Sequence, residues 1–164
     1  MLRIVEFPDD SKFKTIDDCA FSFSNIEEII FPSKDIELKE EWCQGTYKLN
    51  KITISPDNPY FQFYDNKLLI KKSTNEQENY YNLVFCSRNV KNITIPNFIE
   101  QICPYSFNGG FKLHQVDFHN DSRLKTIDYY AFLNSLNNII KIPPQLLTMG
   151  QVSFSFCFCL RRIV

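Results

Sequence analysis

Glycine is scarce in this chain, with 4 residues among 164. These four, Gly45, Gly109, Gly110 and Gly150, form no G-x-G-x-x-G pattern. The segment Asn108–Lys112 contains a Gly-Gly pair but lacks the lysine and hydroxyl spacing of a phosphate-binding loop. Because such motifs need glycine where the backbone approaches phosphate, the sequence gives no support for a nucleotide-binding site.

The chain also lacks an excess of charge of either sign and any long hydrophobic run. It has 18 Lys and Arg against 19 Asp and Glu, with a pI near 6.1. Nucleic acids and anionic membranes need a concentrated positive field, so no nucleic-acid partner is expected. The most apolar run, Phe154–Leu160, is far shorter than the roughly 20 residues that span a bilayer. Residues 1–10 reach two acids and a proline before an apolar signal region can form, so we expect neither a signal peptide nor membrane insertion.

Histidine is nearly absent, and the two that exist lie close together in the sequence. His114 and His119 flank Asp117, and two imidazoles with a carboxylate can bind zinc or transfer a proton. On a strand, however, Asp117 and His119 share one face and His114 points to the other. We therefore expect a solvated loop and strand edge here. No serine or cysteine carries a nucleophile motif, so we predict no catalytic residues, no cofactor, no metal and no enzymatic activity.

The six cysteines are scattered along the chain, mostly beside aromatic residues. Free cysteine behaves as a small core hydrophobe, so we expect buried free thiols. The pair Cys157 and Cys159 can begin a zinc site, but a structural site needs four ligands. No second close pair exists in the sequence.

What the chain does contain is a recurring phrase of an apolar residue, two mostly polar residues and another apolar residue. Its first members are 24, 23, 41, 23, 23 and 24 residues apart. A fixed period in the twenties is the signature of a solenoid. The copies are Leu2–Val5, Ile26–Ile29, Leu49–Ile52, Val90–Ile93, Leu113–Val116, Leu136–Ile139 and Leu160–Ile163.

Each phrase leads into a short strand, because apolar and polar residues alternate in Ile52–Ile54, Ile93–Ile95 and Val116–Phe118. Stacking the copies in parallel places equivalent residues in neighbouring rungs, with Ile52, Ile93 and Val116 adjacent. The expected buried ladder is Val5, Ile29, Ile52, Ile93, Val116, Ile139 and Ile163. We expect Ile30 and Ile140 to face outward as candidate apolar anchors.

A second phrase alternates with the first and ends in an aromatic residue five positions later, as in Phe13–Phe21, Ile99–Phe107, Leu124–Phe132 and Leu146–Phe154. Asp17 and Asp128 are placed to cap one helical turn before this aromatic residue. The aromatic side chain is then expected to fill the convex side of the coil. Trp42 is expected to fill the same position in the second repeat. Together with the prolines that close the first phrase, these residues resemble the BspA-like (treponemal-type) leucine-rich repeat. The resemblance implies an α/β repeat solenoid, a leucine-rich-repeat array with short parallel strands and brief helical turns.

The longest spacing holds an insertion, at residues 57–86. Phe61–Tyr64 and Leu68–Ile70 flank Asp65–Lys67, which predicts a β-hairpin, followed by a mobile loop over residues 71–79. The hairpin aromatics either bind a partner or cover the edge of a repeat. Residues 1–164 otherwise form a single array of about six to seven repeats with incomplete ends, so the chain resembles part of a longer array or relies on a partner to cover its last coil.

The polar positions of the strands change from repeat to repeat while the apolar positions stay apolar. That pattern is typical of a recognition array with a fixed scaffold and a variable face. We therefore predict a protein-binding surface on the exposed strand face. Its candidate residues are Asn50, Lys51, Thr53, Asn92, Thr94, Gln115 and Asp117.

The resemblance implies a surface antigen or adhesin of the kind found in bacteria and protists, which binds host or cell-surface proteins at the cell surface or in the extracellular space. An intracellular scaffold in the cytoplasm is the alternative, favoured by the free thiols and the missing signal. Asn92-Ile-Thr94 and Asn120-Asp-Ser122 match the N-glycosylation pattern. Chance occurrence is the competing explanation, and glycans there would indicate secretion.

Overall fold

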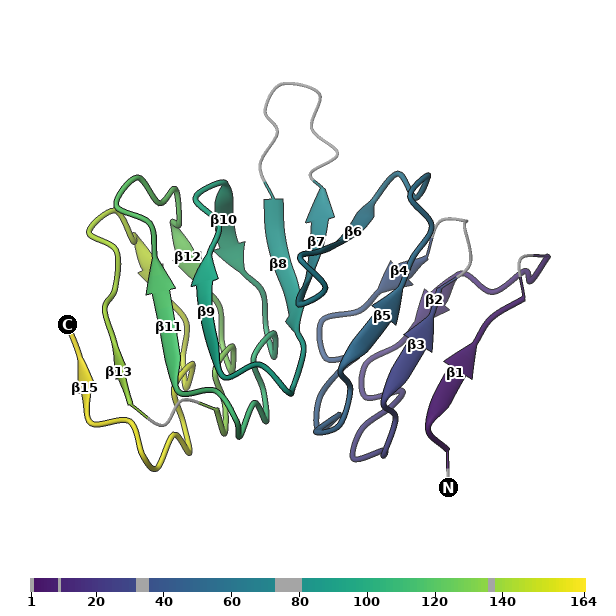
Figure 1. The fold of residues 1–164 in the computed structure, drawn as a ribbon, viewed down its shortest axis with the longest axis horizontal. Helices are drawn as coiled ribbons and strands as arrows, with labels where there is room; N and C mark the ends of the chain where they lie inside the picture. The colour runs from purple at the N-terminus through teal and green to yellow at the C-terminus, as the bar shows by residue number, and fades with distance from the viewer. Residues whose placement is uncertain (1, 9, 32–35, 73–80, 136–137) are drawn as a thin grey trace.

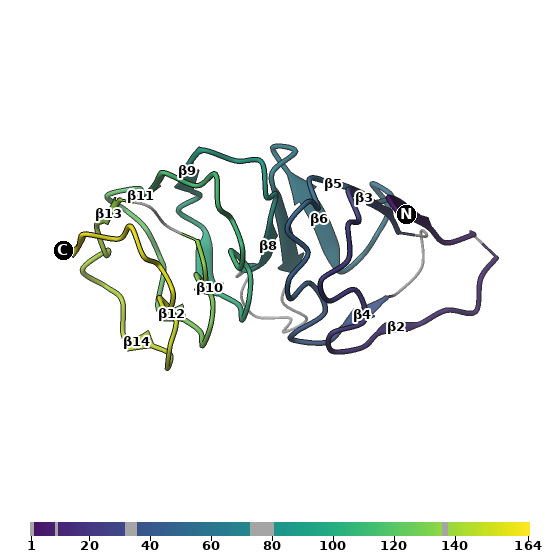
Figure 2. The same cartoon turned by 90° about the horizontal axis from the view of Figure 1, so that it is seen from below.

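The computed structural model describes residues 2–8, 10–31, 36–72, 81–135 and 138–164. The chain winds through successive coils, and each coil contributes one short strand to a front layer and one to a back layer (Figures 1 and 2). The front strands are β1 (Ile4–Glu6), β3 (Glu28–Ile30), β5 (Lys51–Thr53), β9 (Asn92–Ile95), β11 (Gln115–Phe118), β13 (Ile139–Ile140) and β15 (Arg162–Ile163). The back strands are β2 (Thr15–Ile16), β4 (Glu37–Leu38), β8 (Tyr81–Cys86), β10 (Ile99–Ile102), β12 (Thr126–Ile127) and β14 (Thr148–Met149).

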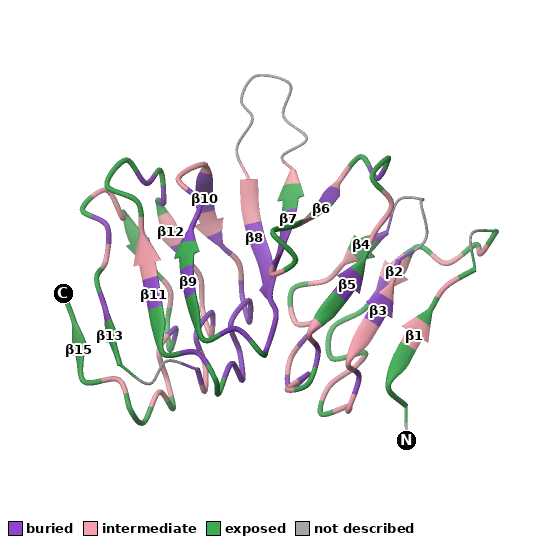
Figure 3. Cartoon of the chain, in the orientation of Figure 1, coloured by how far each residue is buried: buried purple, intermediate pink, exposed green. Residues whose placement is uncertain are grey.

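The strands of each layer pair in parallel, as the repeat predicts. Val5 is paired with Ile29, Ile29 with Ile52, and Ile93 with Val116. Ile52 and Val116 are 3% and 1% exposed, whereas their polar neighbours face solvent, so the front strands alternate between buried and exposed residues (Figure 3). Burial of this aliphatic ladder between the two layers supplies the apolar surface that stabilises stacked repeats.

The expected rung order is wrong at two places. Ile52 and Ile93 are not adjacent, because β5 and β9 belong to separate sheets of three and four strands. Val116 is paired with Ile140 and not with Ile139. Ile140 is fully buried and Ile139 is 47% exposed, so Ile140 is not an outward anchor. A shift of one residue turns every side chain to the opposite face of a strand. Part of the predicted phrase Leu136–Ile139, its residues 136–137, lies outside the described residues.

At the ends of the ladder burial is incomplete. Ile163 is paired with Ile140 but is 45% exposed, and Val5 is half-buried. Ile30, the other expected anchor, is half-buried. Terminal coils have a neighbour on one side only, which accounts for the exposure of their inward positions.

The expected helical turns are also wrong, since the described residues contain strands and turns but no helix. The turn after each back strand closes with a hydrogen bond across three residues, as from the Ala20 amide to the Asp17 carbonyl (3.2 Å). Three residues after the last apolar residue of the back strand, the backbone enters the left-handed region, which ends any helix. This occurs at Cys19, Tyr105, Tyr130 and Val152, and again four residues later at Phe23, Gly109, Asn134 and Phe156.

The aromatic residues at the ends of these turns fill the interior. Phe132 is fully buried, and its ring stacks on Phe107 at 4.5 Å and on Phe154 at 5.0 Å. Trp42 is 1% exposed and contacts Phe31 and Phe85, so its expected role in the second repeat is confirmed. The repeated aromatic therefore forms a continuous stack within the core of the second half of the array.

The predicted hairpin is present. Strands β6 (Phe61–Tyr64) and β7 (Leu68–Lys72) pair antiparallel, and the turn residues Asp65 and Asn66 have φ values of 48° and 50°. Aspartate and asparagine tolerate this conformation better than most residues. β7 also pairs antiparallel with β8, so the hairpin joins the back sheet. Residues 71 and 72, expected in a loop, extend β7; the rest of the expected loop, 73–79, lies outside the described residues.

Candidate protein-binding surface

Four of the seven predicted binding residues form a contiguous patch on β9 and β11. Asn92 is paired with Gln115, and Thr94 with Asp117. The Gln115 side-chain amide donates to both Asp117 carboxylate oxygens, at 3.0 and 2.8 Å. Because Ile93 and Val116 hold the strands against the core, these polar side chains sit on a fixed scaffold.

The other three predicted residues lie at β5, in a separate sheet. Lys51 and Thr53 are exposed on either side of the buried Ile52, and Asn50 is half-buried before the strand. The Lys51 ammonium pairs with Glu28 of β3 at 2.6 Å, and the Thr53 hydroxyl donates to the same carboxylate at 3.2 Å. The structure therefore divides the predicted face into two patches.

The hairpin is what separates the two patches. β6 and β7 lie between β5 and β9 (Figure 1). At one end, the turn before β9 is hydrogen-bonded to the residues that precede β5. The Ser87 hydroxyl donates to the Asn50 carbonyl (2.8 Å), and the Arg88 amide donates to the Leu49 carbonyl (3.0 Å). A groove of about 850 Å³ lies between β5 and the hairpin, and this turn closes one end of it.

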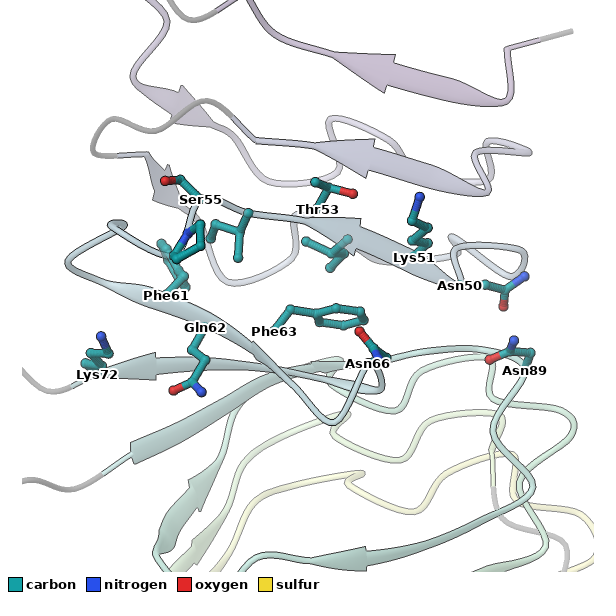
Figure 4. Close-up of a pocket in the computed structure, with 13 residues that line it drawn as sticks. Asn50, Lys51, Thr53, Ser55, Phe61, Gln62, Phe63, Asn66, Lys72 and Asn89 are labelled. Carbon is teal, nitrogen blue, oxygen red and sulfur yellow. The ribbon is translucent and has the colours of Figure 1, made fainter.

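The groove is lined mainly by polar side chains (Figure 4). Asn50 and Asn89 face each other at the closed end, and Lys51 and Thr53 follow along β5. The Phe63 ring lies between the hairpin and β5. The other labelled lining residues are Ser55, Phe61, Gln62, Asn66 and Lys72.

The hairpin aromatics pack mostly against the repeats. Phe61 is 5% exposed, and Tyr60 and Phe63 are partly buried against the core cluster that contains Trp42. Tyr64 is 36% exposed, and its ring lies 5.6 Å from Phe98. Covering the edge of the array thus accounts for three of the four rings.

A buried arginine that sequence reasoning missed lies beside the hairpin. Arg88 is 3% exposed, and its guanidinium donates to the carbonyls of Cys86 (3.1 Å), Ser106 (2.8 Å) and Tyr105 (3.3 Å). Its charged end also lies 4.5 Å from the centre of the Phe85 ring. Burial lowers the pKa of Arg88. The signal in the sequence is slight, because one arginine in a turn is usually solvated.

The cysteines do not share one environment. Cys43 and Cys86 are buried, and burial raises their pKa to about 11 and about 12. Cys19 and Cys159 are exposed, so the expectation of burial is wrong for these two. Cys19 donates its thiol proton toward Gln44 at 3.0 Å, and Cys159 lies in the turn before β15.

His114 and His119 are both exposed, while Asp117 is half-buried beside Gln115. Across the described ranges, no group of three or more histidine, cysteine or acidic side chains is placed to hold a metal ion. In the same part of the chain we find no helix with the length and hydropathy needed to cross a membrane. Of the two glycosylation patterns, Asn92 is exposed on β9, and Asn120 is exposed in a turn whose Ser122 is 4% exposed.

Comparison with known proteins agrees with the architecture. The family described as the BspA type leucine rich repeat region matches residues 1–69 and 78–164, with 6 copies. No curated protein matches the chain. A leucine-rich repeat protein from Eubacterium ventriosum superposes with a TM-score of 0.77 at 20% identity, over 98% of this chain and 41% of that one.

Two further solved structures share the fold. A leucine rich cell surface protein from Faecalibacterium prausnitzii superposes with a TM-score of 0.59 at 18% identity, over 99% of this chain and 59% of that one. The pneumococcal vaccine antigen PcpA gives a TM-score of 0.61 at 19% identity, over 99% and 50% of the two chains. This chain therefore spans less than two thirds of the length of each of these proteins.

Proposed function

Because the chain belongs to the BspA-type leucine-rich repeat family, we propose that it is a non-enzymatic protein-interaction module of the surface-antigen or adhesin type. Its binding face is formed by the exposed residues of β5, β9 and β11. Two structural neighbours, one a cell surface protein and the other a vaccine antigen, support a cell-surface setting. The partner in this proposal is a host or cell-surface protein.

One observation carries the proposal. The inward positions of the front strands remain aliphatic from coil to coil, whereas the outward positions differ in charge, length and hydrogen-bonding capacity. Asn92, Thr94, Gln115 and Asp117 form one such set, and none of them is needed to fill the core. A rigid scaffold that holds varied polar side chains limits the entropy lost on binding.

The test is a binding screen of the full chain against purified secreted and surface proteins, followed by variants of any pair that binds. Replacing Thr53, Thr94 and Asp117 together by alanine is expected to leave the fold intact and to weaken binding by about tenfold or more. The matched control replaces Asp17, Thr126 and Thr148, which lie on the back of the array, by alanine. Equal binding by both triple variants would remove the front face from the proposal.

An intracellular scaffold is the second candidate, and the six free cysteines favour it, since exposed thiols such as Cys19 and Cys159 remain reduced in the cytosol. Surface biotinylation of intact cells that express the native protein separates the two. Labelling, or a glycan on Asn92 or Asn120, supports the surface setting; exclusion from the labelled fraction supports the scaffold.

A further inference from the structure

The front sheet has an unpaired edge where the hairpin divides it. β5 is the last strand of its sheet, and no described strand pairs with its side away from β3. The Lys51 amide donates to the Glu27 carbonyl at 3.1 Å, and the Thr53 carbonyl accepts from the Phe31 amide at 2.9 Å, so the backbone groups of these two residues point toward β3. Alternate residues of a strand direct their backbone groups to opposite edges. The N–H and C=O groups of Ile52, which lies between them, therefore point into the groove.

The charged side chains that line the groove are both lysines. Lys51 and Lys72 line the groove, and none of the described lining residues is an aspartate or glutamate. Lys51 shares its charge with Glu28 of β3, which lies outside the lining, and Lys72 has no ion pair with another described residue. The amides of Asn50, Gln62, Asn66 and Asn89 add donors and acceptors along the groove.

The surroundings of the edge also limit what can bind there. The Ser87–Asn89 turn closes one end, where it is hydrogen-bonded to Leu49 and Asn50, and the hairpin forms the opposite wall with Phe63 (Figure 4). An extended chain rises about 3.3 Å per residue. A segment of roughly four to six residues thus covers the run Lys51–Ser55 beside the free edge.

We infer that the groove binds an extended, acidic peptide segment of the protein partner, which adds to β5 as a further strand. Its backbone pairs with Ile52, its carboxylates lie near Lys51 and Lys72, and an apolar side chain packs on Phe63. Backbone pairing supplies affinity and the alternate side chains supply specificity in this mode of recognition. The inference rests on the proposed protein-binding function and names the kind of segment that the β5 side of the face takes.

The probe is a random dodecapeptide library selected on the full chain, with the best peptide then synthesised for fluorescence anisotropy. Peptides enriched in Asp or Glu that alternate with apolar residues are expected. Binding is expected to fall by about tenfold or more in the Lys51→Glu and Lys72→Glu double variant. It should fall by less in the neutral Lys51→Gln and Lys72→Gln variant, which guards against misfolding. The control, Lys12→Glu with Lys112→Glu, makes the same change in net charge at two exposed residues that do not line the groove.

Backbone pairing is tested separately by N-methylating one peptide amide at a time. Loss of binding at alternate positions is expected, because only every second N–H faces β5. Failure to enrich any peptide, no preference for acids, or a uniform response to methylation overturns the inference. If substitutions of Thr94 and Asp117 weaken binding of a protein partner while the groove variants bind it as the wild type does, the inference about the groove is wrong and the proposed function stands. If no protein binds in the screen, the proposed function itself fails.

Discussion

Truncation of Phe132 probes the stacked core most directly. The side chain is fully buried, and both faces of its ring are covered, by Phe107 at an interplanar angle of 11° and by Phe154 at 6°. Phe→Ala in a core costs about 3–5 kcal/mol, with less loss where the site can collapse. A ring held between two others leaves a cavity that neither neighbour can fill without losing its own contacts. We therefore expect Phe132→Ala to lower the free energy of unfolding by about 4 kcal/mol.

The assay is equilibrium unfolding in urea, followed by far-ultraviolet circular dichroism and by the fluorescence of Trp42. This is the single tryptophan of the chain, and it lies in the core cluster of the first half, whereas Phe132 lies in that of the second. Trp42 contacts Phe85 of β8, and β8 is paired with β10. We therefore expect the two halves to unfold cooperatively, so that both signals shift to lower urea concentration.

Phe158→Ala is the matched control, because the same atoms are removed from a side chain that is 86% exposed. Its effect should stay within about 0.5 kcal/mol. A loss below about 1 kcal/mol for Phe132→Ala would refute the stacked core. A Trp42 transition that stays at the wild-type urea concentration while the dichroism shifts would refute the coupling through β8.

Three further outcomes follow from the electrostatics and the thiols. Arg88→Leu removes the guanidinium hydrogen bonds to three buried carbonyls, of which those of Ser106 and Tyr105 keep a backbone amide as donor. The free energy of unfolding should fall by roughly 3 kcal/mol in urea titrations, and an unchanged midpoint would contradict this. Burial raises the pKa of Asp128, so the folded state binds its proton more tightly than the unfolded state, and the stability due to this group is lost as pH rises above about 4. Asp128→Asn should therefore gain stability relative to wild type as the pH rises from about 4, and a gain that is independent of pH in thermal melts would argue against the assignment. In the native protein, Cys19 and Cys159 should react with a thiol reagent at pH near 8 well before Cys43, whose pKa is raised to about 11; equal rates by mass spectrometry would show that the core is open.

Local signals in the sequence predicted the repeat, the front strands and the hairpin. The alternation around Ile93 and Val116 determines which face is buried, and Asp65–Asn66 tolerates the left-handed turn that the hairpin needs. The back strands were missed because several are only two residues long, as at Thr126–Ile127, which is too short to show a period. The helical turns were predicted wrongly, because helix propensity gives no sign that bulky residues such as Tyr130 adopt the left-handed backbone conformation.

For the proposed binding face, the sequence predicts which polar residues are candidates but not how they are arranged. The polar positions on β9 and β11 follow from the pattern, and they lie side by side as expected. The separation of β5 depends on the antiparallel pairing of β7 with β8, a long-range contact that no local pattern encodes. At the pair Ile139 and Ile140, either residue is apolar enough to enter the core, so the sequence pattern alone does not determine the register.

Hydrogen exchange of the full chain, free and bound to a partner found in the screen, tests the central claim that the front face carries recognition. If the front face binds the partner, exchange should slow over the residues of β5, β9 and β11 and stay unchanged over β10, β12 and β14. Protection confined to the back strands, or spread evenly over both layers, would contradict it.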